Sequence, residues 1–383
     1  MKLAAVADVH LGNHKRFGGD VVGSINTRGR LALDTFRAAV DRARVLRATH
    51  FIVAGDLLDY SRPESPLLAA VQGIMRREGA DFEEVFLMLG NHEQVSTLPG
   101  DHALAPLAVE DHVTIVDRPM LRLLDDLGTE LILVPFQPGH AREWLARVVR
   151  DTLAGSEDAG ARPPRASRGV RVLVLHLGIK DARTPPWLAG ASDAIDIDLL
   201  APICEEHGID YVLAGNWHDR REWRLRGGKT QVLQIGALVP TGWDNPGLDG
   251  YGGLGIYERI VGLTCETIPG PRFVKADSAD TFARMTLAAE KAGHKLFVSF
   301  DAQPEDMAKL TGAVLAATER GDIVGGEVIP NQEEAIVKAK SAAFAAKSSK
   351  TLHEALANYV RVMPLPDTVD RAAVHERAKG YLR

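Results

Sequence analysis

Residues 2–12 read KLAAVADVHLG, so that a short apolar run passes directly into Asp8 and His10. A run of this length and composition predicts a buried strand that ends at the first polar residue. The same arrangement returns in FIVAGDLLD at 51–59 and in VFLMLGNHE at 85–93. Three short strands are therefore expected, and each of them ends in residues of the types that bind metals.

Helices and further strands are expected between and after these runs. Apolar residues recur at helical spacing at 31–47 and 66–77, and two more buried strands are expected at 172–175 and 211–214. Short alternating runs between 221 and 267, separated by Gly and Pro, predict antiparallel strands. Because strand and helix alternate over most of this region, the sequence predicts an α/β fold.

Five successive strand ends carry Asp, Asn or His. In open α/β sheets, ligands bind at the carboxyl ends of the strands, so these side chains are expected to converge. Carboxylate and imidazole together suit borderline divalent ions, and two such ions about 3.5–4 Å apart can share one carboxylate. The sequence therefore predicts a dinuclear centre built from residues at these five strand ends: Asp8 and His10, Asp56 and Asp59, Asn91, His92 and Glu93, His176, and Asn216 and His218.

The ordered set D-x-H, G-D-x-x-D, G-N-H-E, H and G-x-x-H, over about residues 1–260, resembles the calcineurin-like metallophosphoesterases. Within that superfamily, the forms Asp8 to Gly12 and Gly55 to Asp59 resemble the SbcD-type nucleases, also called the meiotic-recombination-eleven family. The resemblance implies a β-sandwich flanked by helices, followed by a small α/β capping domain and a helical C-terminal tail.

The resemblance also implies a role for each residue at a motif position. The first metal would be held by Asp8, His10 and His218, the second by Asn91 and His176, and both by Asp56. His92 would not be a ligand. It would act as a general acid that protonates the leaving oxygen, while Asn91 would help to steady the phosphate.

One position departs from the family pattern, which usually reads G-H-x-H where this chain has Gly215-Asn216-Trp217-His218. Asn216 therefore stands where a histidine of the second metal is expected. A carboxamide oxygen is a weaker and harder donor than imidazole, which favours Mn²⁺, or else Mg²⁺, over Zn²⁺. Asp59 is interpreted as a turn-stabilising carboxylate, and Glu93 as a support for the ligands.

The segment Pro269-Gly270-Pro271 predicts a domain boundary. We expect domains at 1–270 and 272–345 and a helical tail at 346–383. The resemblance implies that the first is the phosphoesterase (nuclease) domain, that the second is a small capping and DNA-binding domain, and that the tail could dock an ATPase partner. The elements expected after the boundary are a strand at 295–300 and helices at 303–318, 332–346, 351–361 and 369–381.

Basic residues near the motifs are candidates for phosphate contacts. His14 follows the first motif, and Arg220 and Arg221 follow the last; each is also interpretable as an ordinary solvated side chain. Arg147 and Arg150 would share one face of a helix. A further basic group lies in the loop expected at 155–170 and consists of Arg162, Arg165 and Arg168.

The favoured function is a metal-dependent DNA nuclease subunit, acting as exo- or endonuclease in DNA end processing, repair or recombination. Its implied partners are DNA, an SbcC-like SMC-type ATPase that would contact the apolar stripe Leu352, Leu356, Tyr359 and Val360, and a second copy of the chain. Two alternatives stay open. One is a phosphodiesterase or phosphatase for small substrates, and the other is a DNA-end-binding scaffold subunit with weak catalysis.

Composition sets the remaining limits. The net charge of −6 weighs mildly against a nucleic-acid binder, although two divalent ions would add positive charge at the site. The chain has 383 residues with only two cysteines, Cys204 and Cys265, which favours the reducing cytoplasm. No apolar run approaches 18 residues, so no membrane span is expected.

Overall fold

The structure is a computed structural model. It describes residues 1–96, 98, 100–155, 169–243, 246–303, 306–330, 360 and 370–379. Most of the loop expected at 155–170, the helix expected at 332–346, and all of the one expected at 351–361 except Val360 lie outside the described residues. The chain divides into two compact units, 1–299 with 313–327, and 300–312 with 328–383. The division at 270 stays a prediction.

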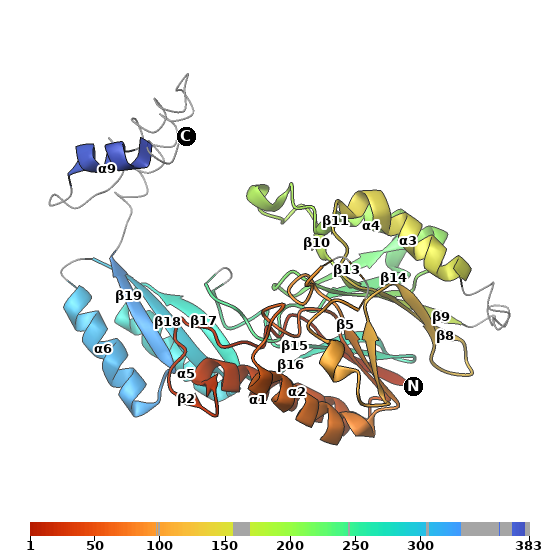
Figure 1. Ribbon diagram of the computed structural model, residues 1–383, viewed down its shortest axis with the longest axis horizontal. Helices are drawn as coiled ribbons and strands as arrows, with labels where there is room; N and C mark the ends of the chain where they lie inside the picture. The colour runs from red at the N-terminus through yellow and green to blue at the C-terminus, as the bar shows by residue number, and fades with distance from the viewer. Residues whose placement is uncertain are drawn as a thin grey trace. The chain divides into compact units, whose positions relative to one another are not determined.

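The first unit contains two six-stranded sheets (Figure 1). The first sheet has the order β16-β15-β1-β4-β5-β6, in which β1, β4, β5 and β6 are parallel and β15 and β16 run antiparallel. In the central register, Ala5 lies opposite Ile52, and Ile52 lies opposite Phe86. The strands are β1 (Lys2–Val6), β4 (His50–Val53), β5 (Glu84–Met88), β6 (Val113–Val116), β15 (Gly253–Glu258) and β16 (Gly262–Thr267).

The second sheet has the order β13-β14-β12-β9-β8-β7. Its four central strands are parallel, and the edge strands β7 and β13 are antiparallel to their neighbours. The strands are β7 (Met120–Leu123), β8 (Thr129–Val134), β9 (Val170–His176), β12 (Tyr211–Gly215), β13 (Arg221–Leu225) and β14 (Thr230–Gln234).

Helices cover the outer face of each sheet, so the unit has four layers (Figure 1). The continuous apolar strands are buried on both faces, as parallel strands with helices outside must be. In β1, Ala4 packs towards the helix layer with Phe36, whereas Leu3 and Ala5 pack between the two sheets. The first sheet is covered by α1 (Thr27–Val45) and α2 (Ser65–Arg77), and the second by α3 (Ala141–Gly155) and α4 (Ile197–Glu206).

Helix α1 begins four residues before the expected helix. Its first turn, Thr27 to Arg30, has no apolar residues, so hydrophobic periodicity does not reveal it. The start is set instead by Asn26, whose side-chain oxygen accepts a hydrogen bond of 2.8 Å from the backbone N–H of Gly29. The N-cap therefore decides where this helix begins.

Short elements connect the layers. They are the strands β2 (Val21–Val22), β3 (Ile25–Asn26), β10 (Gly178–Lys180) and β11 (Ala194–Asp196), and the 3-10 helices η1 (Gly79–Asp81), η2 (Ala105–Leu107), η3 (Pro186–Leu188) and η4 (Arg226–Gly228). β2 pairs with β3, and β10 pairs with β11. β10 begins two residues after His176, the candidate ligand at the end of β9.

The C-terminal part forms a three-stranded sheet of order β17-β18-β19 with two helices along its sequence. Helix α5 begins at the N-cap Ser278 and ends at Gly293, which has the left-handed conformation that terminates many helices. The elements are β17 (Pro271–Ala276), α5 (Ala279–Ala292), β18 (Lys295–Ala302), α6 (Met307–Arg320), β19 (Gly325–Pro330) and α9 (Arg371–Lys379).

The predicted α/β class, with a sandwich flanked by helices, is confirmed. The five ligand-bearing strands are divided between the two sheets of the sandwich, because β1, β4 and β5 belong to the first sheet and β9 and β12 to the second. One expectation was partly wrong, since β14 is parallel to β12, although β13–β14 and β15–β16 are antiparallel. No helix among the described residues is long and apolar enough to cross a bilayer.

Candidate metal centre

The backbone at the strand ends is bent into a conformation that most residues avoid. Four residues carry a positive φ there: Asp8 at 52°, His10 at 49°, Asp56 at 52° and Asn216 at 77°. Such strained residues gather at functional sites, where the surrounding structure holds them in place. Here the backbone N–H groups of Val9 and His10 donate to the carbonyl of Asp56 at 2.8 and 3.0 Å, so the first two motifs support each other.

Asp8, His10 and His218 form a first cluster, with ligand atoms all within 4.8 Å of one another. The Nε2 atoms of His10 and His218 face each other at 3.0 Å, although they come from different sheets. Burial, reinforced by the nearby His10, lowers the pKa of His218 to about 3. His218 is therefore neutral, with a ring nitrogen available as a ligand, and two such nitrogens beside a carboxylate suit a divalent ion.

Asp8, Asp56 and His176 form a second cluster of the same kind. Nε2 of His176 lies 3.3 Å from Oδ2 of Asp56 and 3.3 Å from Oδ1 of Asn91. The other ring nitrogen, Nδ1, lies 2.7 Å from the carbonyl oxygen of Ala54 and donates to it, which leaves Nε2 directed at the cluster. Asp56 also lies 4.0 Å from Nε2 of His10, so it faces both clusters.

The buried charges of these clusters shift one another. Burial raises the pKa of Asp8 to about 6, and repulsion from Asp56 adds to this effect. Burial opposes protonation of His176, but attraction by Asp56 and Asp8 outweighs it and raises the pKa of His176 to about 10. The same attraction by His176 holds the pKa of Asp56 well below its usual range, against its burial. Two carboxylates and three imidazoles packed this closely are a donor set that fits two divalent cations.

His92 lies beside the clusters and is half-exposed, with 36% of its side chain accessible, whereas Asp8, His10, Asp56 and His176 are buried. Its Nδ1 lies 2.8 Å from the carbonyl oxygen of Asp59, and its Nε2 lies 4.0 Å from Oδ2 of Asp56. Its backbone N–H donates to Oδ1 of Asp56 at 3.1 Å. With Nδ1 donating to a carbonyl, the ring is oriented and Nε2 is left free at the accessible side.

Asp59 has a larger part in the site than the sequence indicated. Its carboxylate lies 3.3 Å from Nδ1 of His10, 3.4 Å from Nδ1 of His14 and 3.8 Å from Nδ1 of His92. It therefore orients a candidate ligand and the candidate general acid, beyond stabilising a turn. The G-D-x-x-D motif was the sequence signal for this role, because it places a second carboxylate in the same loop, three residues after Asp56.

Glu93 is fully buried and joins the second and third motifs. Its carboxylate accepts hydrogen bonds from the backbone N–H groups of Leu58 at 2.9 Å and Gly90 at 2.8 Å. Burial, with repulsion from Asp56, raises the pKa of Glu93 to about 8. Glu93 contacts backbone rather than the ligand atoms, in agreement with its interpretation as a support.

Two glycines allow these loops to approach each other. A Cβ on Gly90 would lie 1.9 Å from Oδ1 of Asp56, and a Cβ on Gly55 would lie 2.0 Å from Nδ1 of His176. Gly55 also has a φ of 92°, which favours glycine. Both positions are therefore closed to any other residue unless the ligands move.

The basic candidates for substrate contact differ in their surroundings. Nε2 of His14 lies 3.1 Å from the carbonyl oxygen of His10, so His14 adjoins the first cluster. Arg220 donates to Oγ1 of Thr267 at 3.1 Å. The Arg221 guanidinium is already engaged by two carboxylates, Asp181 and Asp219. The proposed contact of Arg221 with phosphate therefore loses support. Arg147 and Arg150 lie on the helix α3, as expected. The remaining basic candidates, Arg162, Arg165 and Arg168, are outside the described residues.

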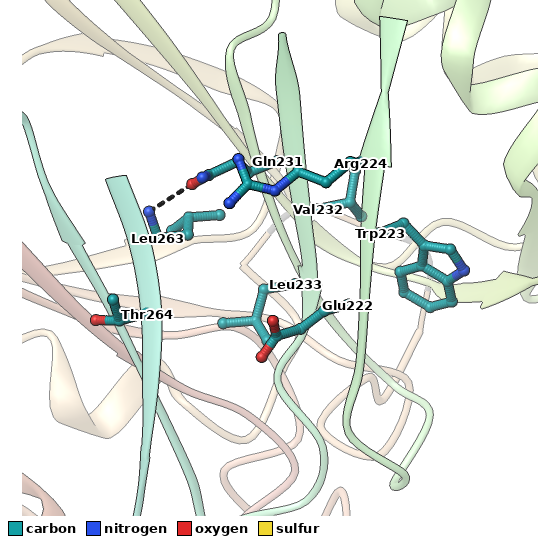
Figure 2. A pocket seen from close by; sticks show the side chains of 8 residues that line it. All are labelled: Glu222, Trp223, Arg224, Gln231, Val232, Leu233, Leu263 and Thr264. Carbon is teal, nitrogen blue, oxygen red and sulfur yellow. Dashed lines mark hydrogen bonds between the residues drawn. The ribbon is translucent and has the colours of Figure 1, made fainter. Parts of the chain in front are cut away.

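A separate cavity lies between β13 and β14 of the second sheet and the edge strand β16 of the first (Figure 2). It has a volume of about 160 Å³ and is lined from β13, β14 and β16. The side chain of Gln231 accepts a hydrogen bond of 2.7 Å from the backbone N–H of Leu263, which ties β14 to β16 across the sandwich (Figure 2). None of its lining residues is a candidate ligand, so this cavity is not part of the metal centre.

Comparison with known proteins gives one curated relative and several solved structures. The DNA double-strand break repair protein Mre11 of Methanopyrus kandleri is 27% identical over 116 residues. These residues make up 30% of this chain, and the match spans only about a quarter of that relative, 24% of its length.

The solved structures are more remote. GAP50, the anchor in the inner membrane complex of Plasmodium, is 11% identical, with a TM-score of 0.42, over 74% of this chain and 94% of that chain. A putative 5'-nucleotidase from Staphylococcus aureus is 16% identical, with a TM-score of 0.38, over 76% of this chain and 58% of that chain. Likeness at this level bears on neither substrate nor mechanism.

The sequence model of one family, the calcineurin-like phosphoesterases, matches residues 1–220. That range covers more than half of the 383 residues and contains every candidate ligand of the two clusters. It also contains the supporting residues Asp59 and Glu93. The chain belongs to the calcineurin-like phosphoesterase family.

Proposed function

We propose that this protein is a metal-dependent nuclease that hydrolyses phosphodiester bonds in DNA. The observation that carries the hydrolytic part is the convergence of Asp8, His10, Asp56, His176 and His218 from two sheets into two adjoining clusters. The similarity to Mre11 supports DNA as the substrate, over the segment that it covers.

In this proposal, Asp8, His10 and His218 hold the first ion, Asn91 and His176 hold the second with Asn216, and Asp56 contacts both. Such ions, when bound, activate a water molecule and offset the charge on phosphoryl oxygens. We propose Mn²⁺ as the metal, with Mg²⁺ as the alternative, because oxygen donors from Asn91 and Asn216 suit these hard ions better than Zn²⁺.

His92 is proposed as the general acid. Its Nδ1 is occupied by the carbonyl of Asp59, so its Nε2 is the atom that would give a proton to the leaving oxygen. Asn91 would hold a phosphoryl oxygen through its amide while its Oδ1 faces His176. Because His92 is oriented by hydrogen bonds through Asp59 and Asp56, the acid and the ligands form one connected arrangement.

The partners follow from the same proposal. We propose that the tail at 346–383 binds an SbcC-like SMC-type ATPase and that the protein forms a homodimer; most of the tail, with Leu352, Leu356 and Tyr359, lies outside the described residues. Residues 272–345 are proposed to help in binding DNA. The cytoplasm is the proposed location, in keeping with the two free cysteines, Cys204 and Cys265.

The test uses the purified full chain with a panel of phosphodiesters. End-labelled double-stranded and single-stranded DNA, a cyclic nucleotide and bis-p-nitrophenyl phosphate are each incubated with Mn²⁺, Mg²⁺ or EDTA. We expect cutting of DNA with Mn²⁺ and none with EDTA. Fast turnover of the small diesters without DNA cutting would replace this proposal with a small-substrate phosphodiesterase. Tight binding of DNA ends without any turnover would replace it with a scaffold subunit.

A further inference from the structure

The Asn216 carboxamide stands where the family pattern has a histidine of the second metal, and its orientation is fixed by one neighbour. Nδ2 of Asn216 donates to the backbone carbonyl of Asp193 at 2.8 Å and to Oδ2 of Asp193 at 3.1 Å. Asp193 directly precedes β11 (Ala194–Asp196), on the loop that follows His176 and β10. Its carbonyl also accepts the backbone N–H of Gly178 at 3.0 Å, which holds it in place.

Both partners of the Asn216 amide group are acceptors that have no proton to give. A carbonyl oxygen and a carboxylate accept hydrogen bonds, and the NH₂ group is the only donor of a carboxamide, so the NH₂ end must face Asp193. The two ends of a carboxamide diverge from one carbon, so the oxygen is turned away from Asp193. Within the part of the chain that the structure describes, Oδ1 of Asn216 accepts no hydrogen bond.

The residue itself adjoins the second cluster. Its backbone N–H donates to both carboxylate oxygens of Asp8, at 3.1 and 3.0 Å. The preceding residue, Gly215, packs against the ring of His176, because a Cβ there would lie 3.2 Å from Nδ1, the nitrogen that donates to Ala54. The left-handed backbone at Asn216, with φ at 77°, is one that Asn tolerates better than most residues.

We infer that Asp193 is a positioning residue that turns the Asn216 carboxamide so that its oxygen, and not its NH₂ group, is presented to the second metal position. The inference rests on the proposed metal centre but not on DNA as the substrate. Asn216 can then serve as a ligand in place of the expected histidine. Asp193 supplies the two acceptors that select one of the two orientations of the Asn216 amide group.

The test measures Mn²⁺ binding to the full chain, by titration calorimetry for stoichiometry and affinity and by electron paramagnetic resonance for spin coupling between paired ions. We expect two ions in the wild type. Asp193→Ala removes one acceptor but keeps the carbonyl of residue 193, so the second ion should bind about 10-fold more weakly, the low end of the usual loss for such partners. The first ion should be unaffected.

Two further variants separate orientation from charge. Asp193→Asn removes the charge but keeps an oxygen that can accept from Asn216, so its second ion should bind close to wild type. Asp196→Ala removes a carboxylate from the same segment, one that is 55% exposed and lies 3.5 Å from Nζ of Lys180, and should also bind like wild type. Thermal melting of all variants checks that each is folded.

Three outcomes would overturn the inference. They are a wild type that binds one ion, an Asp193→Ala variant that binds the second ion as tightly as wild type, and equal weakening by Asp193→Ala and Asp193→Asn. A protein that binds two coupled ions, responds to Asp193→Ala as expected and yet does not cut DNA would support the inference while refuting the nuclease proposal.

Discussion

Gly90→Ala tests how tightly the second and third motifs are packed. The added Cβ would lie 1.9 Å from Oδ1 and 2.5 Å from the backbone N of Asp56, whereas real Cβ atoms essentially never come within 3.0 Å of another heavy atom. One of the two loops must therefore move by about 1 Å or more. Asp56 is the candidate bridge, and its Oδ1 also accepts the N–H of His92.

The expected result has two parts. Overpacking of this kind costs about 1–3 kcal/mol of unfolding free energy. Metal sites require ligand distances within about 0.2 Å, and a shift of 1 Å costs on the order of 10²-fold in rate, so Mn²⁺ affinity and turnover should both fall at least that far. Urea unfolding, titration calorimetry and phosphodiesterase assays measure these quantities.

Gly190→Ala is the matched control, because a Cβ there meets nothing within 4 Å. It should leave stability within about 0.5 kcal/mol of wild type, as surface substitutions usually do, and should not change metal binding. If Gly90→Ala bound Mn²⁺ with wild-type affinity, the close approach of the two motifs and the bridging position of Asp56 would both be refuted.

Three further predictions concern pH, metal and charge. In metal-free protein, the pKa of His176 is raised from its ordinary value of 6.5 to about 10, so the pair with Asp56 contributes stability that is present below pH 6.5 and lost as the pH rises towards 10. The melting temperature in EDTA should fall over that range, and a flat profile would count against the Asp56–His176 pair. Saturating Mn²⁺ at about 100 times its dissociation constant should add about 2.7 kcal/mol of stability, reversed by EDTA, and an unchanged melting curve would argue against a metal centre. Arg221→Gln should leave the salt dependence of DNA binding unchanged, because carboxylates already engage its guanidinium; a smaller slope by about one would show that it contacts a phosphate.

The sequence predicted the ligand-bearing strands well because they combine two strong signals. Strands such as β1 and β5 are continuous apolar runs buried on both faces, and each passes directly into polar residues. Among the strands that were not predicted, β8 passes into Pro135 and Phe136 and not into a ligand-type residue, and β7 is half-exposed on the edge of its sheet. A motif search therefore passes over them.

The assignment of strands to sheets could not be predicted from local pattern. Hydrophobic periodicity shows that a strand is buried but not which strand lies beside it. The chain leaves the first sheet after β6 and enters the second at β7, so β5 and β9 belong to different sheets although both end at the metal centre. The Nε2 atoms of His10 and His218 meet at 3.0 Å only because the two sheets are stacked.

Some residues that support the ligands could be predicted from the sequence, and others could not. Asp59 and Glu93 lie within the motifs, so the sequence could predict that they support the ligands. It could not predict that the Asp59 carboxylate approaches three histidines. Asp193 carries no sequence signal, because it lies in a stretch of small residues and reaches Asn216 from 23 positions away. Its contact depends on the folded path of the loop between β10 and β11.

The central claim is that this site cuts DNA, with His92 as the acid and not as a ligand. Its most direct test measures Mn²⁺-dependent cutting of end-labelled DNA by wild type and by His92→Ala, with Mn²⁺ binding measured on both. We predict cutting by wild type that EDTA abolishes, a loss of about 10²–10⁴-fold in His92→Ala, and equal Mn²⁺ binding by the two proteins. Undiminished cutting by His92→Ala, or no cutting by wild type with any metal, would contradict the account.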